Sequence, residues 1–326
     1  MKKISSTLSC ALLLLGAYIS LGEAHAQSSW PSKAVKIIVP YPPGGAVDVV
    51  SRKMAQKLTE QTGQNFFVEN RAGATGTIGA SAVARSEADG YTLMANDVTY
   101  AMLPHIFNKL PFDVNSDLVP VGGYMFTPMA LAVGTQSRFT TLADLITEAK
   151  RKPNTVSYGT GGPGSSPHFA TEAFGIAANA NLLHIPFKGA GEATLAILSN
   201  TIDMQIASTT GLMSNVKSGK LRLLAVSGDK RLGILPDVPT FAEAGVAWPG
   251  VVNWIGLWAP KGSPTEMAVR LQKEIATAMN SADMKQFAER MGAEPKYASS
   301  EAFAKMIKDS TETWGKVVAN TAFEKQ

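Results

Sequence analysis

The sequence predicts an α/β protein made of two units that two crossing segments join. Over residues 34–125, short apolar runs alternate with amphipathic stretches of helical period, which is typical of a parallel sheet with helices on both faces. A longer apolar stretch at 118–133, interrupted by glycines and a proline, is expected to pass from the first unit to the second. The apolar and aromatic residues 251–259 are expected to return. The expected division is a leader of residues 1–26, a first unit of 27–128 with 249–326, and a second unit of 129–248.

Residues 1–26 have the features of a secretory signal peptide. Two lysines near the start precede an apolar run at 8–21 that is too short for a membrane span. Ala24-His25-Ala26 fits the small-x-small cleavage rule, so we expect export and cleavage before Gln27. The only cysteine, Cys10, lies in this leader, so the mature chain is expected to form no disulfide.

The first unit is expected to begin with an apolar strand at 35–39 and an amphipathic helix at 47–62. In this helix, Val50, Met54 and Leu58 are spaced by four residues and form an apolar face. The other elements expected in this unit are a strand at 66–68, a helix at 78–86 and a strand at 91–95.

The elements of the second unit and of the C-terminal part follow from similar patterns. Thr140 or Thr141 is expected to cap a helix. Ser263 with Glu266 fits a capping box, and Ser300 fits an N-cap of the last helix. The expected strands lie at 155–158, 182–186, 202–207 and 221–226, and the expected helices at 140–150, 169–178, 192–199, 265–291 and 300–318.

Composition argues against several function classes. The formal net charge is only +4, and no basic stripe with interleaved aromatic residues is present, so we expect no nucleic-acid partner. The sequence contains no His-x-x-x-His or Cys-x-x-Cys spacing, so we expect no bound metal. We also expect no cofactor, although one glycine-rich loop tests that expectation below.

The first glycine-rich loop, Tyr41-Pro42-Pro43-Gly44-Gly45-Ala46-Val47-Asp48, joins the first strand to the first helix. Such a loop places unpaired backbone N–H groups and the positive end of the helix dipole together, which suits an anion. The alternative is a βα turn whose glycines only permit tight geometry. Asp48 is expected to accept hydrogen bonds at the helix start, and as a general base it has no neighbour that completes a mechanism.

The polar segment Asn96-Asp97-Val98-Thr99-Tyr100 follows another expected strand. Ligands of open α/β sheets bind at the carboxyl ends of strands, so Asp97 and Thr99 are candidate ligand contacts. The alternative is a helix cap, in which one of these side chains satisfies first-turn N–H groups.

Another glycine-rich loop, Gly159-Thr160-Gly161-Gly162-Pro163-Gly164-Ser165-Ser166-Pro167-His168, matches the dinucleotide fingerprint between a strand and a helix. The following strand has no acidic residue to hold a ribose, and Pro163 and Pro167 remove backbone donors. Export also takes the chain away from the cytoplasmic nicotinamide pool. A carboxylate site fits better, because Ser165 and Ser166 are N-cap types and Pro167 suits the first helical position. His168 fits a capping or packing role better than a catalytic one.

Several sequence strings together resemble one family. They are Val39-Pro40-Tyr41-Pro42-Pro43-Gly44-Gly45 with Asp48, Val68-Glu69-Asn70-Arg71-Ala72-Gly73, Asp89-Gly90-Tyr91-Thr92-Leu93, Gly164-Ser165-Ser166 with His168, Pro186-Phe187-Lys188-Gly189, Leu235-Pro236-Asp237-Val238-Pro239-Thr240 and Trp254-Ile255-Gly256-Leu257-Trp258-Ala259-Pro260. The chain resembles the periplasmic substrate-binding proteins of tripartite tricarboxylate transporters, the Bug-type receptors, over essentially the whole mature sequence.

The resemblance implies a type II periplasmic binding fold, in which two α/β lobes close like a flytrap on a small carboxylate. It also implies a monomer in the periplasm that delivers this ligand to the membrane subunits of a tripartite tricarboxylate transporter, and no enzymatic activity. The loops at 41–48 and 159–168, which include Tyr41 and Gly161, would clasp one carboxylate, partly through ordered water. Carried over residue by residue, Pro43, Gly44, Gly45 and Ala46 would supply backbone contacts, and Asp48 would hold the loop or a water. Ser165, Ser166 and His168 would form the opposite side of the site, and Lys188, Gly189 and Ala190 would border its distal end.

Two departures from the family pattern bear on the ligand. Val47 stands where many relatives have Thr or Ser, so one hydroxyl is expected to be missing. Ser208 and Thr209 follow the strand at 202–207 where many relatives have an aspartate. We therefore favour a ligand without a cationic amine, such as a dicarboxylate or an aromatic carboxylate.

Two other function classes remain open from the sequence. One is an exported α/β enzyme that acts on a small carboxylate through Asp48 or His168, although the sequence offers no Gly-x-Ser-x-Gly nucleophile elbow. The other is a periplasmic sensing subunit, which would use the same cleft and signal instead of importing.

Overall fold

A computed structural model gives the arrangement of the chain. The leader at 1–26 and its cleavage site fall outside the described residues, as does the start of the return crossing. The described residues are 30–248, 253–321 and 323–326.

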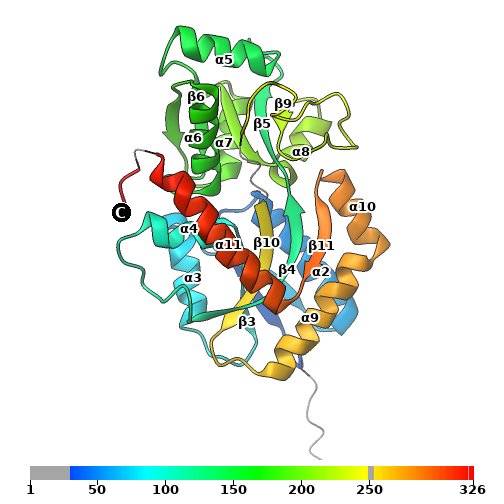
Figure 1. Ribbon diagram of the computed structural model, residues 1–326. Coiled ribbons are helices and arrows are strands. Elements are labelled where there is room, and N and C mark those ends of the chain that lie inside the picture. Colours follow the sequence, from blue (N-terminus) through cyan, green and yellow to red (C-terminus); the bar gives the residue numbers. More distant parts are fainter. Residues whose placement is uncertain (1–29, 249–252, 322) are drawn as a thin grey trace, which may run out of the picture.

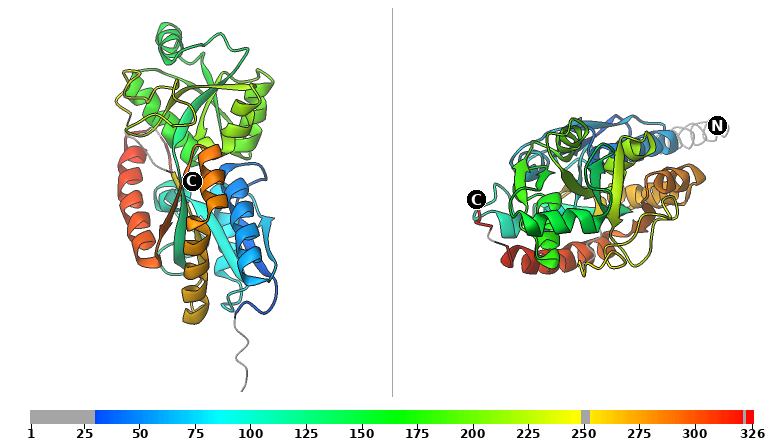
Figure 2. Two further views of the ribbon diagram at one scale, coloured as in Figure 1. Left: turned by 90° about the vertical axis from the view of Figure 1, so that its right-hand side faces the viewer. Right: turned by 90° about the horizontal axis from the view of Figure 1, so that it is seen from above.

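The chain forms two α/β lobes that are stacked along the long axis of the molecule (Figure 2). Lobe 1 is built on a six-stranded sheet of order β11-β4-β10-β3-β1-β2. In it, β1 pairs in parallel with β2 and β3, whereas β10 is antiparallel to both β3 and β4. Its strands are β1 (Val35–Val39), β2 (Phe66–Asn70), β3 (Thr92–Asp97), β4 (Leu118–Thr127), β10 (Asn253–Pro260) and β11 (Glu294–Ala298).

Lobe 2 is built on a five-stranded sheet of order β7-β6-β8-β5-β9. Strand β6 pairs in parallel with β7 and β8, whereas β5 is antiparallel to β8 and β9. Its strands are β5 (Met129–Gly134), β6 (Ser157–Thr160), β7 (Leu183–Pro186), β8 (Met204–Ser208) and β9 (Leu221–Val226).

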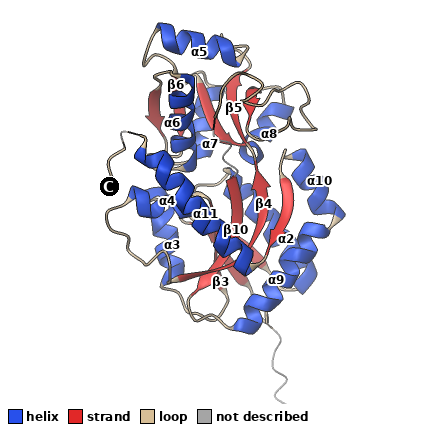
Figure 3. Cartoon of the chain, viewed as in Figure 1, coloured by secondary structure: helices blue, strands red, loops and turns tan. Residues whose placement is uncertain are grey.

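Helices flank the strands of both lobes (Figure 3). Among the described residues, no helix is both long enough and apolar enough to span a membrane. Lobe 1 carries α2 (Ala46–Thr62), the short 3₁₀ turn η1 (Ala74–Gly76), α3 (Thr77–Ala84), α4 (Thr99–Ile106), α9 (Thr265–Asn280), α10 (Ala282–Arg290) and α11 (Ser300–Ala319). Lobe 2 carries α5 (Leu142–Arg151), α6 (Ser166–Ala178), α7 (Ala190–Leu198) and α8 (Thr209–Lys217).

The apolar stretch at 118–133 makes the expected passage between lobes, but as two strands. Strand β4 ends at Thr127 in the lobe 1 sheet, and β5 begins at Met129 in the lobe 2 sheet (Figure 1). Pro128 lies between them and has no N–H to donate to a ladder, so it separates the two pairings. The other passage leads to β10, whose first described residue is Asn253.

The C-terminal helices correct three predictions. The expected helix at 265–291 is two helices, because Ser281 is extended (φ −69°, ψ 146°) and caps α10 by accepting from the Met284 N–H. The capping box predicted at Ser263 is wrong, because Pro264 is the N-cap of α9 and, within the described chain, makes no side-chain cap bond. The last helix is capped by Ser299 instead of Ser300. The cap predicted at Thr141 is confirmed, as a capping box with Asp144.

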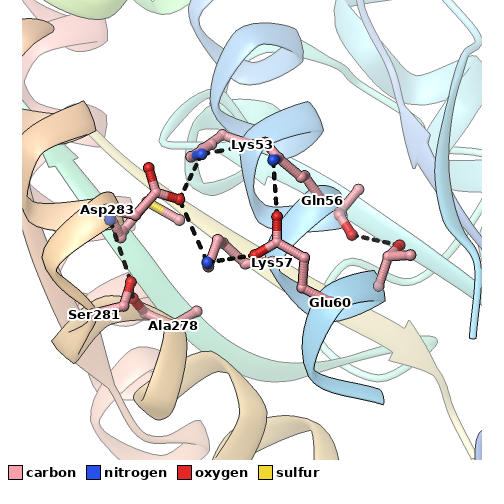
Figure 4. A network of polar contacts seen from close by, with 10 residues as sticks. Lys53, Gln56, Lys57, Glu60, Ala278, Ser281 and Asp283 are labelled. Atoms are coloured by element: carbon pink, nitrogen blue, oxygen red, sulfur yellow. Dashed lines mark hydrogen bonds and ion pairs between the residues drawn. The ribbon is translucent and has the colours of Figure 1, made fainter. Parts of the chain in front are cut away.

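Helix α2, which follows the first glycine-rich loop, is tied to α10 by an ion-pair cluster. The Asp283 carboxylate lies 2.7 Å from the Lys53 ammonium and 3.4 Å from the Lys57 ammonium (Figure 4). Both lysine side chains are more than four-fifths buried, whereas the Asp283 side chain is 45% exposed, so solvent screens these pairs in part. This cluster fixes the helix whose first turn forms part of the site described below.

The core of lobe 1 contains a contact that only glycine permits. Phe303 of α11 lies against β10 and packs edge-on against Trp254 and Trp258, at centroid distances of 5.1 and 4.9 Å. A Cβ atom on Gly256 would lie 2.1 Å from the Phe303 ring. Glycine at this position therefore lets an aromatic ring lie directly on the sheet.

Gly256→Ala is therefore expected to lower the free energy of unfolding by about 1–3 kcal/mol, the usual cost of overpacking a core. Urea unfolding followed by tryptophan fluorescence measures the change. Gly233→Ala is the matched control and should be near neutral, because its Cβ would have no described atom within 4 Å. Equal stability of the two variants would contradict the packing account.

Candidate functional site

A cavity of about 70 Å³ lies where the two lobes meet. This volume is the space open to the centre of a water-sized sphere, and one buried water needs about 10–15 Å³ of it. The cavity therefore has room for a few waters or a small organic molecule. Loops and helix starts from both lobes line it. The lining residues are Tyr41, Pro42, Gly44, Gly45, Ala46, Val47, Asp48, Thr75, Asp97, Thr99, Gly161, Ser165, Ser166, Pro167, Gly189, Ala190, Gly191, Thr194, Ala207, Ser208 and Gly211.

Helices α2, α6, α7 and α8 all begin at the wall of this cavity. Their N-cap residues are Gly45, Ser165, Gly189 and Ser208, and none of these makes a side-chain cap hydrogen bond within the described chain. First-turn N–H groups have no acceptor in their own helix, and the helix dipoles add positive charge at the same ends. The cavity thus collects uncapped backbone donors from both lobes.

The serine hydroxyls that could have capped these helices bind elsewhere. Ser165 Oγ donates to the Gly162 carbonyl at 2.7 Å. Ser208 Oγ accepts from Asn253 Nδ2 of lobe 1 at 2.6 Å.

The first N–H of α6, from Ser166, donates to Thr99 Oγ1 at 3.2 Å, and the first N–H of α8, from Thr209, donates to the Pro128 carbonyl at 2.9 Å. The N–H groups left for another acceptor are therefore mainly those at the starts of α2 and α7 and the later ones in the first turn of α8.

Asp48 holds the first glycine-rich loop in shape. Its Oδ2 accepts from the Gly44 N–H at 3.0 Å, and its Oδ1 accepts from Asn70 Nδ2 at 2.9 Å and lies 2.9 Å from Arg52 Nη2. Burial would raise the pKa of this carboxyl, but Arg52 and the N–H donors outweigh burial and lower it. Asp48 is therefore an ionised anchor of the loop, and its negative charge is matched by Arg52.

Asp97 is the centre of a buried polar network at the junction of the lobes. Its Oδ1 accepts from the Thr99 N–H at 3.0 Å and from the Tyr41 hydroxyl at 3.2 Å. Its Oδ2 accepts from Asn253 Nδ2 at 3.3 Å and from Ser166 Oγ of lobe 2 at 3.4 Å. Burial raises the pKa of Asp97, and burial together with the Asp97 charge raises the pKa of Tyr41.

The charges around the cavity differ from those of an ion-pairing site. No lysine or arginine occurs among the described lining residues, and the two lining carboxylates, Asp48 and Asp97, are already bonded to protein donors. An anion in this cavity would meet backbone N–H groups and hydroxyls. A cation in this cavity would find both carboxylates of the described lining already bonded to protein donors.

His168 lies behind the cavity wall and serves packing. Its Nδ1 accepts from the Gly164 N–H at 3.2 Å, and its ring stacks on His184 at 4.3 Å. His184 in turn bonds Thr160 Oγ1 at 2.7 Å and stacks on Tyr158. Burial lowers the pKa of each histidine to about 4, so both rings are neutral at neutral pH.

The glycines of the dinucleotide-like string serve packing between elements. A Cβ on Gly159, which lies within β6, would be 2.4 Å from the Ile202 side chain. A Cβ on Gly164 would be 2.8 Å from the Ile106 side chain of lobe 1. These contacts account for Gly159 and Gly164 without a pyrophosphate, whereas Gly161 lines the cavity.

The structure brings most of the sequence-predicted residues to the cavity. Thr209 lies outside the lining, and its hydroxyl donates to the Gly292 carbonyl of lobe 1 at 2.9 Å. The predicted residues in the lining are Tyr41, Gly44, Gly45, Ala46, Asp48, Asp97, Thr99, Gly161, Ser165, Ser166, Gly189, Ala190 and Ser208, and those outside it are Pro43, His168, Lys188 and Thr209.

Other lining residues were not predicted as site residues. Val47 and Pro167 flank predicted positions, so loop position is a signal that could have found them. Thr194 lies one helical turn after Ala190, which is also a usable signal. Thr75 lies in a glycine-rich stretch at 69–79 that leads into the expected helix at 78–86, but nothing singled out this residue within it. The unpredicted lining residues are Pro42, Val47, Thr75, Pro167, Gly191, Thr194, Ala207 and Gly211.

Comparison with known proteins gives one consistent picture. Residues 50–323 match the family model described as tripartite tricarboxylate transporter family receptor. The protein BugT of Bordetella pertussis is 33% identical over 95% of this chain and 97% of its own length. The structure of R. palustris Rpa4515 with adipate has a TM-score of 0.86 at 30% identity, covering 89% of this chain and 97% of that one. The periplasmic binding protein BugD has a TM-score of 0.87 at 29% identity, covering 91% and 100%.

The His168–His184 pair predicts acid sensitivity of the folded state. Histidine ordinarily titrates near pH 6.5, so between pH 6.5 and pH 4 the unfolded chain binds more protons than the folded chain. The contribution to stability is fully present above about pH 6.5 and is lost as the pH falls toward 4. His168→Asn keeps an acceptor for the Gly164 N–H, and it should flatten the loss between pH 7 and pH 5 by about 1–2 kcal/mol. Urea unfolding at both pH values measures this, and identical pH slopes in the two proteins would refute it.

Proposed function

The chain belongs to the tripartite tricarboxylate transporter receptor family, and we propose that it captures a small organic carboxylate in the cavity between its lobes. The observation that carries this proposal is the set of helix starts after Gly45, Gly189 and Ser208, which come from both lobes, have no side-chain cap and surround one cavity. Several helix N-termini acting on one carboxylate take the place of an arginine clamp. The structural neighbour Rpa4515 was solved with adipate, which supports a small organic carboxylate as the ligand.

The carboxyl groups already bonded inside the protein support a ligand without a cationic amine. Asp97 accepts from donors of both lobes, and Asp48 is matched by Arg52. The last residue of β8 is Ser208, which brings a hydroxyl in place of a charge at the start of α8. A dicarboxylate or an aromatic carboxylate is therefore the ligand class that we favour.

Capture requires the lobes to open and close, because the cavity between them is small. In the closed arrangement, Ser166 donates its N–H to Thr99 Oγ1 at 3.2 Å, and Asn253 bonds Ser208 across the lobes. A ligand that contacts both lobes has higher affinity for the closed state and shifts the population toward it.

The titratable groups favour binding over catalysis. His168 lies outside the cavity lining and its Nδ1 accepts a backbone N–H, while Asp48 anchors a loop. Family membership and the signal-like leader support a monomeric receptor in the periplasm, cleaved before Gln27, that delivers the ligand to the transporter's membrane subunits.

A thermal-shift screen of residues 27–326 against carboxylates, with matched amines as controls, tests the ligand class. A ligand at about a hundred times its Kd stabilises by roughly 2.7 kcal/mol, which raises the melting temperature by several degrees. A rise with a dicarboxylate such as adipate and none with the matched diamine is expected. A rise with amines alone would overturn the proposal.

Gly45→Pro tests the helix start of α2 directly. Gly45 has φ −78°, which proline adopts, so the substitution removes one N–H with little backbone change. Loss of one hydrogen bond to a charged ligand should weaken binding about tenfold or more in titration calorimetry. Gly45→Ala is the matched control, because it keeps the N–H and its Cβ has no described atom within 4 Å. Equal affinity of the two variants would place the anion elsewhere.

A further inference from the structure

The turn between β2 and α3 has an unusual backbone. Gly73, Ala74, Thr75 and Gly76 all have positive φ, at 136°, 45°, 51° and 89°. Glycine adopts such angles readily, but a β-branched residue in the left-handed region is a genuine outlier. The conformation of Thr75 therefore costs conformational free energy that other interactions must offset.

The residues that follow Thr75 pack against Pro40 and Tyr41, where the first site loop begins. A Cβ on Gly76 would lie 3.4 Å from the Tyr41 hydroxyl oxygen, and one on Gly79 would lie 2.9 Å from the Pro40 Cα. The Thr77 hydroxyl donates to the Ala74 carbonyl at 2.9 Å and closes the turn from within. The backbone that follows Thr75 is thus packed closely against the segment that leads into Tyr41.

The side chain of Thr75 reaches across the lobes. Its Oγ1 donates to the Pro163 carbonyl of lobe 2 at 3.0 Å, and this bond lies at the exposed rim of the junction. Thr75 also lines the cavity and is half-buried. Pro163 belongs to the glycine-rich loop that leads into α6, so the bond joins the turn before α3 to the lobe 2 side of the site.

We propose that Thr75 is a positioning residue that holds the two lobes closed over the ligand through its bond to Pro163. The inference rests on the proposed function in one respect, since closure matters only for a protein that captures a ligand. The strained backbone is the cost of aiming this hydroxyl at the other lobe. Threonine, and not glycine, occupies the turn because the bond to Pro163 favours the closed state.

Three substitutions separate the hydroxyl from the strain. Thr75→Val keeps the β-branched shape and the strained backbone but removes the donor. Thr75→Ser keeps the donor. Thr75→Gly removes the hydroxyl and the β-branched side chain. It should therefore relieve the backbone strain in the folded state while it loses the hydrogen bond to Pro163. A merely structural role would instead move stability and closure in the same direction.

Closure is measured without any ligand, by the distance between two spin labels. Cys10 is the only cysteine and lies in the leader, so residues 27–326 take labels only where cysteines are introduced. Lys150→Cys on α5 and Val269→Cys on α9 are both exposed and lie on different lobes (Figure 1). Double electron–electron resonance then gives the closed-to-open ratio of each variant.

Thr75→Val and Thr75→Gly should lower the closed-to-open ratio about three- to tenfold, the effect of one neutral hydrogen bond, and Thr75→Ser should retain the ratio. Thr75→Gly should also match or exceed the parent's melting temperature. An unchanged ratio in Thr75→Val would overturn the inference, as would a ratio in Thr75→Ser as low as that in Thr75→Val.

Adipate serves as the probe for the functional consequence. Its dissociation from Thr75→Val should be faster than from Thr75→Ser by a similar factor. If the parent binds no carboxylate while the spin-label distances still respond to the hydroxyl, the proposed ligand class fails and the role of the Thr75 hydroxyl in closure stands. If the parent binds adipate and the distances do not respond, only the role of the Thr75 hydroxyl fails.

Discussion

The closed arrangement depends on one buried carboxyl group. Asp97 at the end of β3 accepts from Thr99 and Asn253 of lobe 1 and from Ser166 of lobe 2. A buried carboxyl group left without such donors costs far more than any single hydrogen bond contributes. The start of α4, the start of β10 and the start of α6 must therefore meet in one place, and their meeting sets where the two lobes touch.

The topology then determines what else reaches this junction. In open α/β sheets, ligands bind outside the carboxyl ends of the strands. Strands β1 and β3 of lobe 1 and β6 and β8 of lobe 2 present those ends, with their following loops, to the same junction. Helices that start directly after such strands bring their first turns along. The concentration of backbone donors in the cavity is thus a result of two α/β lobes that face each other.

The sequence predicted the strands and helices of both lobes where the hydrophobic period was clear. Strand β1 lies at 35–39 as predicted, and α2 begins one residue before its predicted start. The break at Ser281 was missed because the apolar period continues through it, and tertiary packing decides where the chain turns. The elements α8 and β11 were not predicted, because each is short and has few residues in which a period can be recognised.

The loops around the cavity were predicted because glycine, proline and N-cap residues mark helix starts in any fold. Asn253 was missed, since its partner Asp97 lies 156 residues away and only the folded chain brings them together. Thr75 was missed for a different reason, because no local rule predicts a threonine with φ of 51°. Lys188 was expected at the distal end of the site from the family resemblance, yet it lies outside the cavity lining.

A site whose donors belong to the main chain has a consequence for divergence. Every non-proline residue carries the same backbone N–H, so replacing the side chain at Ala46 or Ala190 leaves the donor of that residue in place. In duplicated copies of such a gene, lining residues such as Thr194 or Ala207 can be substituted, which changes the preference for the rest of the ligand. The backbone hydrogen bonds to the acid group of the ligand persist. Selectivity and affinity for the acid group can thus evolve separately in this architecture.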